Sequence, residues 1–540
     1  MGRLRGLEGE LKMVRRMMVR RRTLAVVGVA ALAPLFVSAA AAQAASASLT
    51  VTTLGRHGAK VATTVTVVAV PSGRTYSVSS GKRLGLPSGR YLAMTDIYES
   101  APDGLGTDTI GAQVVQVSGN KAVTLDARKG KAVKVSLDTP ADVTGPPRIS
   151  AQVCAASMDM PDAFSAGGWN DEGSLYAIPN SSPLLQFGYL AQWSGDDGYV
   201  VVKNSKGIPA APGGSFKRSQ LASVHFAVRS GTEMGTQVYT ALQAEPKVDD
   251  CTTDLMAGVR DDNAPYGATV HVTPGTWQPR DDISGSNGED VSGGFPKLRT
   301  LKTGQSVTQS FGRAVWGPTH NLPLLGDRSV TFWPDGLVND PDVGGGSGDI
   351  TKETVVLSKG ATTVKKQTLT DWRNSDDEFS APVRSAGWYR LTVDGQRYRP
   401  GITFPAGMLS SRVTLDWHFK VADPARAWVA PVFLTRFLPA GLNSHNQAAP
   451  NSTTTVGVTP GRESQGPDTR LTGVTVKSVR VWSSADGGRT WKAATVTHSG
   501  TAWQASVHNP ASGAVALRSE VTDTAGDSSV QTVYRAYAIG

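Results

Sequence analysis

The chain has 540 residues, and at about 150 residues per domain this length predicts about three to four domains. Charged residues make up 18% and hydrophobic residues 39%, which suffices for several small cores but not for a membrane protein. Only two cysteines are present, so the composition excludes a disulfide-dense scaffold and a metal site built from four cysteines.

The first 44 residues have the order of a secretory signal peptide. Residues 1–22 carry eight basic and two acidic side chains, residues 23–44 carry no charge, and residues 42–44 fit an A-x-A cleavage site. The alternative is a membrane anchor, but the apolar run over 24–37 has 14 residues where a spanning helix needs about 20. The candidate start residues are Met1, Met13, Met17 and Met18.

Cleavage would change the charge of the chain. The formal net charge is +9, and removing eight basic and two acidic side chains leaves +3. Nucleic-acid binding needs a clustered basic surface, and a nearly neutral chain does not indicate one. No cysteine precedes Cys154, and the C-terminus has no hydrophobic tail. We therefore expect an extracellular, secreted protein with neither a membrane anchor nor a nucleic-acid partner.

The two cysteines are predicted to form one disulfide, because paired cysteines are usual in oxidising compartments. Cys154 and Cys251 would close a 98-residue loop. The chain-entropy model values such a bridge at up to about 4.7 kcal/mol. The alternative is a reactive thiol, but no matching histidine signature accompanies either cysteine.

Strand patterns dominate the mature chain. Residues 412–420 alternate without a fault, with Val413, Leu415, Trp417 and Phe419 on one side and polar side chains on the other. A period of two with one polar face predicts a strand packed on one side only. Gly, Pro, Asn and Asp, which favour turns, recur about every ten positions, as is typical of β-sandwiches. The predicted fold is all-β, with tandem β-sandwich modules.

Four modules are predicted after the signal peptide of residues 1–44. They are a sandwich over 45–138, a β module with the disulfide over 149–279, a sandwich over 298–422, and an Ig-like or fibronectin-III-like sandwich over 426–540. Residues 140–147 form a proline-containing linker in this scheme. Residues 281–296 are rich in glycine and acidic residues, so we expect an exposed linker there as well.

The sequence contains one complete copy of a known turn motif. Ser484, Asp486, Gly488, Thr490 and Trp491 match the Asp-box pattern S-x-D-x-G-x-T-W of sialidase-type propellers. A propeller needs several copies at a regular interval, and only one copy is present. The motif therefore predicts a structural β-hairpin turn, with the aspartate capping it, the glycines at positive φ and the tryptophan packed beneath it.

No catalytic constellation is found. The G-x-S-x-G elbow is absent, and the S-x-x-K match at residues 79–82 lacks its companion motifs. The eight histidines are scattered without H-E-x-x-H, and His418 is predicted to be an exposed strand histidine. The sequence thus names no catalytic and no cofactor-binding residue.

Two weaker sets of candidate residues remain. Structural calcium is a candidate at Asn339, Asp340, Asp342 and Asp349, although an EF-hand loop starting at Asp340 lacks its needed fifth and twelfth ligands, so a solvated turn is the alternative. Aromatic rings can also stack on sugars. Tryptophans in or beside strand patterns are expected in cores. These are Trp316, Trp388, Trp417 and Trp482. Trp169 and Trp193, in glycine- and aspartate-rich loops, are the candidates for ligand binding.

An ordered set of stretches resembles a known family. The stretches are 125–128 with 133–135, 315–318, 354–360, 386–391, 409–413 with 417–419, 431–439 followed by 442 and 443, and 481–491 ending in 532–537. Together they resemble the C-terminal accessory region of large secreted bacterial subtilisin-family serine peptidases, over most of residues 46–540. His418 departs from the family pattern, which favours a small hydroxyl residue. The peptidase domain itself does not appear, so the resemblance implies a non-catalytic accessory region in free-standing form.

Three functional hypotheses follow. The first is a secreted, non-catalytic multi-domain β protein with a binding or structural role, whose unknown extracellular partner is another protein, a peptidase or a polymer surface. The second is a carbohydrate- or cell-wall-binding protein, which predicts a row of exposed aromatic rings. The third is an enzyme of unrecognised type, which requires a pocket with converging titratable groups.

Overall fold

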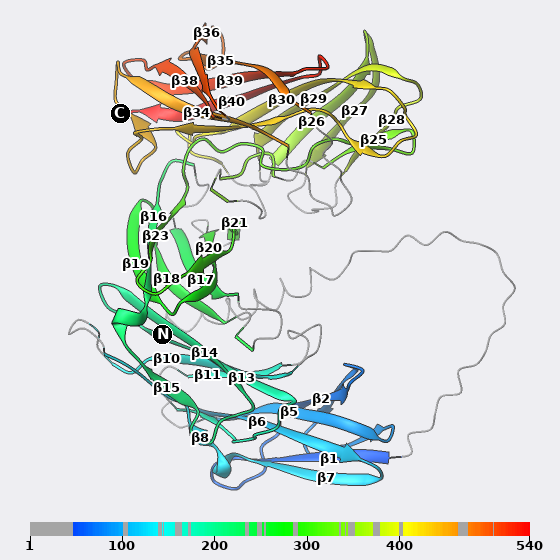
Figure 1. Cartoon of the computed structure of the whole chain (residues 1–540), viewed down its shortest axis with the longest axis vertical. Helices are drawn as coiled ribbons and strands as arrows, with labels where there is room; N and C mark the ends of the chain where they lie inside the picture. Colours follow the sequence, from blue (N-terminus) through cyan, green and yellow to red (C-terminus); the bar gives the residue numbers. More distant parts are fainter. Residues whose placement is uncertain are drawn as a thin grey trace, which may run out of the picture. The chain divides into compact units, whose positions relative to one another are not determined.

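The computed structural model describes residues 47–540 except for short internal segments (Figure 1). The segments left out are 101–105, 139–142, 144, 157–164, 171–173, 233–236, 246–250, 253–254, 285–289, 334–335, 341, 344–350, 371–377, 399–402, 463–473 and 501. The predicted signal peptide lies outside the described residues. Within them there is no α-helix, and no helix long and apolar enough to cross a membrane. Two 3-10 turns occur, η1 (Ala127–Lys129) and η3 (Arg218–Gln220). The predicted all-β fold is confirmed.

The N-terminal part contains two packed sheets. A three-stranded sheet has the order β4 (Arg83–Leu86), β1 (Ala47–Leu54), β7 (Asn120–Asp126). A six-stranded sheet has the order β3 (Thr75–Ser79), β2 (Thr64–Val70), β5 (Gly89–Glu99), β6 (Thr107–Val117), β12 (Leu175–Ala177), β8 (Lys131–Ala132). Side chains alternate along β5, so Tyr91 and Ala93 pack toward the three-stranded sheet.

The middle part also contains two large sheets and one short pair. A seven-stranded sheet has the order β11 (Ser165–Asn170), β10 (Arg148–Ala155), β13 (Leu185–Trp193), β14 (Gly198–Lys206), β19 (Tyr266–Val272), β16 (Ala222–Val228), β23 (Ser306–Phe311). A five-stranded sheet contains β18 (Met256–Asn263), β17 (Gln237–Ala244), β20 (Gly275–Ser284), β21 (Asp290–Gly294) and β22 (Arg299–Leu301). Strands β15 (Gly213–Phe216) and β9 (Lys134–Leu137) form a pair.

The C-terminal part is built on a nine-stranded sheet. Its strands are β27 (Thr362–Thr370), β26 (Thr351–Lys359), β29 (Gly387–Arg397), β30 (Arg412–Val421), β40 (Ser528–Ile539), β39 (Gly513–Asp523), β35 (Val476–Ser484) and β36 (Lys492–Ala493), with β33 (Gln447–Ala448) beside β40. One four-stranded sheet contains β32 (Leu434–Pro439), β34 (Thr453–Gly461), β38 (Ala502–His508) and β37 (Thr495–Ser499). Another contains β28 (Phe379–Pro382), β25 (Ser329–Phe332), β24 (Leu324–Gly326) and β31 (Trp428–Val429).

The predicted alternation in β30 is confirmed. Val413, Leu415, Trp417 and Phe419 are all buried, whereas Arg412, His418 and Lys420 are exposed. The Trp417 indole donates a hydrogen bond to the Phe433 carbonyl at 3.1 Å, so its one polar group is satisfied inside the core. The exposed position of His418 is confirmed as well.

The predicted module boundaries do not separate the sheets. Strand β12, from the predicted second module, pairs in parallel with β6 of the first. Strand β23, from the predicted third module, pairs in parallel with β16 of the second. Strand β40, from the predicted fourth module, pairs with β30 of the third. Three of the sheets therefore continue across the predicted boundaries, because strands from neighbouring segments pair within the same sheet.

The expected linker at residues 281–296 is also wrong. This segment contains the end of β20 and all of β21, which pair with each other. Asp281 and Asp282 are buried, and Asp282 forms an ion pair with buried Arg280 at 2.8 Å. The acidic, glycine-rich composition of this segment does not indicate exposure, because a charged side chain can be buried when it forms an ion pair. Asp282 forms such a pair with Arg280 of the same strand.

The predicted disulfide is confirmed. Cys154 lies near the end of β10 and is bonded to Cys251, which precedes β18, with 5.6 Å between the two Cα atoms. The bond therefore ties the seven-stranded sheet to the five-stranded sheet. Gln152 donates a hydrogen bond to the Cys251 carbonyl at 2.9 Å. A Cβ at Gly188 would lie 2.0 Å from the same carbonyl, so only glycine allows this approach.

We expect removal of the disulfide to destabilise the protein by about 2–5 kcal/mol, because the unfolded chain regains the freedom of a long loop. Urea unfolding of the Cys154→Ser/Cys251→Ser variant against wild type measures this difference. The native, unreduced protein should resist alkylation at both cysteines. Alkylation of both would contradict the bridge.

Candidate functional site

The described surface contains a cleft of about 560 Å³. Residues 296–299, β23, the loop 313–319, residues 342–343 and the facing ends of β32 and β34 line it. Its charged side chains are Lys297, Arg299, Arg313, Arg436 and Asp342. We call this feature the cationic cleft, because four basic groups face one carboxylate.

The single carboxylate is shared between two arginines. Arg436 donates a hydrogen bond to Asp342 at 3.0 Å, and Arg313 lies 3.7 Å from the other oxygen of the same carboxylate. Arg299 donates to the Gln309 side chain at 3.2 Å. All three arginine side chains remain partly accessible to solvent. The cleft therefore offers a net positive charge with donors still available to an anion.

A buried carboxylate positions the loop that carries Arg313. Asp340 accepts backbone N–H hydrogen bonds from Gly312 at 2.5 Å, Arg313 at 3.3 Å and Asp342 at 2.8 Å. Asn446 supports the same loop by accepting from the Ala314 N–H at 3.0 Å. These contacts hold Arg313 and Asp342 at one wall of the cleft.

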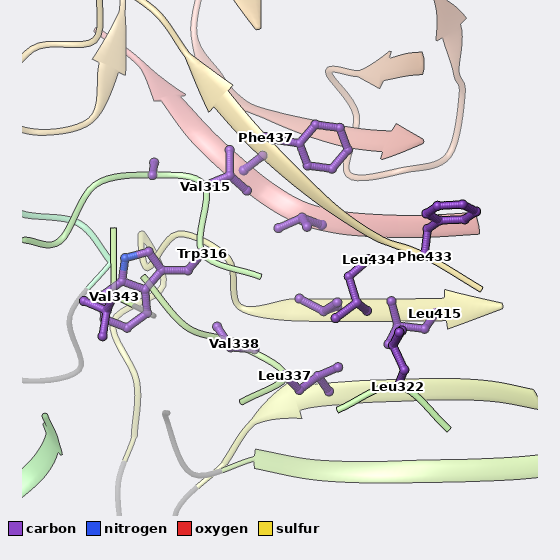
Figure 2. Close-up of a cluster of buried hydrophobic side chains, with 14 of the residues drawn as sticks. Val315, Trp316, Leu322, Leu337, Val338, Val343, Leu415, Phe433, Leu434 and Phe437 are labelled. Atoms are coloured by element: carbon purple, nitrogen blue, oxygen red, sulfur yellow. The ribbon is translucent and has the colours of Figure 1, made fainter. Parts of the chain in front are cut away.

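An apolar cluster lies beneath the cleft. Val343 and Leu434 line the cleft and are both buried. Figure 2 shows them within a set of buried side chains that includes Trp316, Leu337 and Phe437. Close packing in such a cluster gives the lining a rigid support.

Burial raises the pKa of Asp340 to about 7, and repulsion from Asp342 adds to the effect. The three backbone donors act in the opposite direction and favour the ionised form. Asp281 is also fully buried, and burial followed by repulsion from Asp340 raises its pKa well above the usual range. An ionised Asp340 therefore opposes the ionisation of Asp281.

The calcium candidates have other partners. Asn339 donates its side-chain amide to Thr319 at 2.9 Å, Asp340 accepts backbone N–H groups, and Asp342 pairs with arginines. Asp349 lies outside the described residues. Within the part of the chain that the structure describes, no three acidic, histidine or cysteine side chains are arranged to hold a metal ion. Asn339, Asp340 and Asp342 thus contribute to the contacts that anchor this loop.

The two candidate ligand-binding tryptophans both lie in strands rather than in the expected loops. Trp193 is only 5% exposed at the end of β13, so its proposed role as an exposed aromatic is wrong. Its face of β13 packs against the six-stranded sheet. Trp169 lies in β11 opposite Ser150 of β10, and its side chain is outside the description.

Core packing is confirmed for Trp316 and Trp417 but not for Trp388, which is 36% exposed. On the outward face of the nine-stranded sheet, Trp388 stacks on His418 with 4.7 Å between ring centroids. Three further rings on this sheet carry an arginine against one face. The pairs are Arg518 with Trp491 at 4.0 Å, Arg412 with Tyr534 at 4.8 Å and Arg480 with Trp482 at 5.6 Å.

The Asp-box forms the predicted turn between β35 and β36. Asp486 accepts from the Arg489 and Thr490 N–H groups and from the Thr490 hydroxyl, and Ser484 donates to it at 2.7 Å. Gly488 has a φ of 90°, and the Trp491 indole donates to its carbonyl at 3.0 Å. The motif is structural in this chain.

The cationic cleft was missed from the sequence. Its basic residues lie at positions 297, 299, 313 and 436, and no local pattern joins them. The sequence shows two of these basic residues close together, in Lys297-Leu298-Arg299, but only the structure shows that Leu298 between them is 54% exposed. The sandwich module predicted over 298–422 begins within this segment.

No family model and no curated protein matches the chain. Among solved structures, a Streptococcal ancillary pilin matches at 8% identity over 49% of this chain and 98% of that one, with a TM-score of 0.12. The chicken CNTN1 FN1-FN3 domains match at 10% identity over 63% and 90%, with a TM-score of 0.14. The native conformation of E. coli alpha-2-macroglobulin matches at 10% identity over 89% and 38%, with a TM-score of 0.15. Similarities at this level carry no functional argument.

We expect Asp340→Asn to flatten the pH dependence of stability between about pH 4 and pH 7. The raised pKa means that the folded chain keeps a proton that the unfolded chain releases, so the free energy of unfolding falls as pH rises through this window. Urea midpoints at several pH values measure the slope for the variant and for wild type.

Asp486→Asn is the matched control. The Thr490 hydroxyl, followed by backbone and Ser484 hydrogen bonds, holds the pKa of Asp486 well below its usual range. Its stabilisation is present above about pH 4 and is lost as pH falls, which is the opposite sign. An unchanged slope in Asp340→Asn between about pH 4 and pH 7 would refute the assignment.

Proposed function

We propose that this chain is a secreted, non-catalytic binding protein whose anionic ligand occupies the cationic cleft. The observation that carries the proposal is the imbalance of four basic side chains against one carboxylate around a cleft of about 560 Å³. Guanidinium groups match the geometry of carboxylates and phosphates, so such a lining selects anions. The disulfide supports an oxidising, extracellular compartment.

The chemistry of the lining favours binding over catalysis. Among the described lining residues there is no histidine or cysteine, and the one carboxylate is held by two arginines. A general base needs a free acceptor in reach of the substrate. The resemblance to peptidase accessory regions supports a role beside an extracellular protein.

The test compares two triple variants of equal charge. Arg299→Ala/Arg313→Ala/Arg436→Ala removes three charges from the cleft, and Lys121→Ala/Lys129→Ala/Lys131→Ala removes three exposed charges elsewhere. Calorimetric titration with poly-glutamate and with inorganic polyphosphate measures binding. We expect the cleft variant to bind at least about tenfold more weakly, because charge-assisted hydrogen bonds are lost. Equal losses in both variants would show non-specific attraction and contradict the proposal.

Asp342→Asn should have the opposite effect. The substitution removes the carboxylate that competes for Arg313 and Arg436, so we expect tighter binding of both polyanions. The same titrations provide the measurement. Weaker binding would mean that Asp342 orients the arginines for the ligand rather than competing with it.

The alternative is carbohydrate binding, favoured by the half-exposed rings on the nine-stranded sheet. Four of these rings already have a cation or imidazole against one face, which competes with a sugar for the same surface. We therefore expect no retention of the protein on chitin, cellulose or insoluble cell wall in pelleting assays. Retention that is lost in Trp388→Ala and kept in Trp388→Phe would support the alternative instead.

A further inference from the structure

One wall of the cationic cleft is the edge of a sheet. Strand β23 ends the seven-stranded sheet, and β16 is its one neighbour among the described strands. Thr308, Gln309 and Ser310 of β23 line the cleft. An exposed strand edge offers backbone donors and acceptors to an added strand.

The hydrogen-bond register shows which backbone groups are open. Ser223 donates to the Gln305 carbonyl at 2.8 Å and Arg229 donates to the Phe311 carbonyl at 2.9 Å. Because bonding alternates along a strand, the odd-numbered residues from 305 to 311 face β16 and the even-numbered residues face away. The Ser310 carbonyl accepts from the Gln309 side chain at 2.9 Å. Thr308 is exposed and lines the cleft, and by this register its backbone groups face away from β16.

The other strand edge at the cleft is already closed. Thr435 of β32 donates its N–H to the Gln531 side chain at 2.9 Å, and the Gln531 amide donates back to the Thr435 carbonyl at 2.6 Å. The Gln531 side chain thus takes the place of a neighbouring strand. This contrast identifies β23 as the edge available to a ligand.

The lining also specifies the side chains of an added strand. Lys297 and Arg299 flank Leu298, which is 54% exposed, and Arg313 and Arg436 lie in the same lining. Basic groups with an exposed leucine between them fit a segment that alternates acidic and apolar residues. A polysaccharide or polyphosphate would satisfy the charges but not the open backbone groups of Thr308.

We propose that the cationic cleft binds an extended acidic peptide segment of a partner protein, which pairs with the free edge of β23 as an added strand. This inference rests on the proposed anion-binding function and names its ligand class. Main-chain hydrogen bonds to Thr308 would supply affinity for any strand, and the basic side chains would select acidic sequences.

The experiment uses the whole chain after the predicted signal peptide. The probe is an acetylated, amidated peptide of alternating glutamate and valine, six residues long to match β23. Its controls are the lysine–valine peptide, the same acidic peptide with N-methylated backbone amides, and inorganic polyphosphate. We expect the acidic peptide to bind, the basic one not to bind, and N-methylation to weaken binding about tenfold or more, because lost backbone hydrogen bonds cost this much.

Two substitutions at one position test the same bond from the protein side. Thr308→Pro removes the outward N–H, and a proline is tolerated at an edge position whose N–H faces solvent. Thr308→Val keeps the N–H with nearly the same side-chain volume. We expect Thr308→Pro to weaken peptide binding about tenfold and to leave polyphosphate binding unchanged, while Thr308→Val changes neither. Urea unfolding checks that both variants fold.

The outcomes distinguish this inference from the proposed function. If polyphosphate binds and depends on the cleft arginines, but N-methylation and Thr308→Pro leave peptide binding unchanged, strand addition is wrong and anion binding stands. If neither polyanion nor acidic peptide binds wild type, both proposals fail. If Thr308→Pro does not fold, the N-methylated peptide alone decides.

Discussion

Sheets with two apolar faces are the constraint on which the described structure depends. Along β5, Tyr91 and Ala93 pack toward the three-stranded sheet, whereas Leu92 and Met94 pack toward the seven-stranded sheet. Along β14, Val200 and Val201 enter two different cores in the same way. Each of these sheets therefore needs a partner on both sides. Fully burying one such side chain stabilises the fold by about 1.5–3 kcal/mol, so leaving a face uncovered would be costly.

The cationic cleft is lined by strands of two different sheets. Residues of β23 and β32 both line it, and Arg313 lies at the start of the loop after β23. Backbone groups of this loop need buried acceptors, which Asp340 and Asn446 supply. Buried apolar side chains fill the space beneath the cationic cleft, while its charged side chains remain at the surface.

The charge balance of the cleft differs from that of the nine-stranded sheet. On that sheet three arginines each pair with one carboxylate, in the pairs Arg390–Asp416, Arg412–Asp394 and Arg480–Glu520. Such exposed pairs contribute little to stability, and the two charges cancel within each pair. In the cleft one carboxylate pairs with two arginines, and two further basic side chains belong to the lining. The cleft therefore carries an excess of positive charge, which an anion from another molecule can neutralise.

The sequence by itself determined the local features of this protein. Alternation predicted the buried face of β30, the Asp-box predicted the turn at Ser484–Trp491, and the two cysteines predicted their own pairing, because each depends on residues close in sequence or on a single available partner. Only the tertiary structure decided which strands share a sheet, that Trp193 is buried, and that Arg299, Arg313 and Arg436 meet around one cleft. The pairing of β12 with β6 and the burial of Trp193 depend on segments distant in the sequence, so no local pattern encodes them.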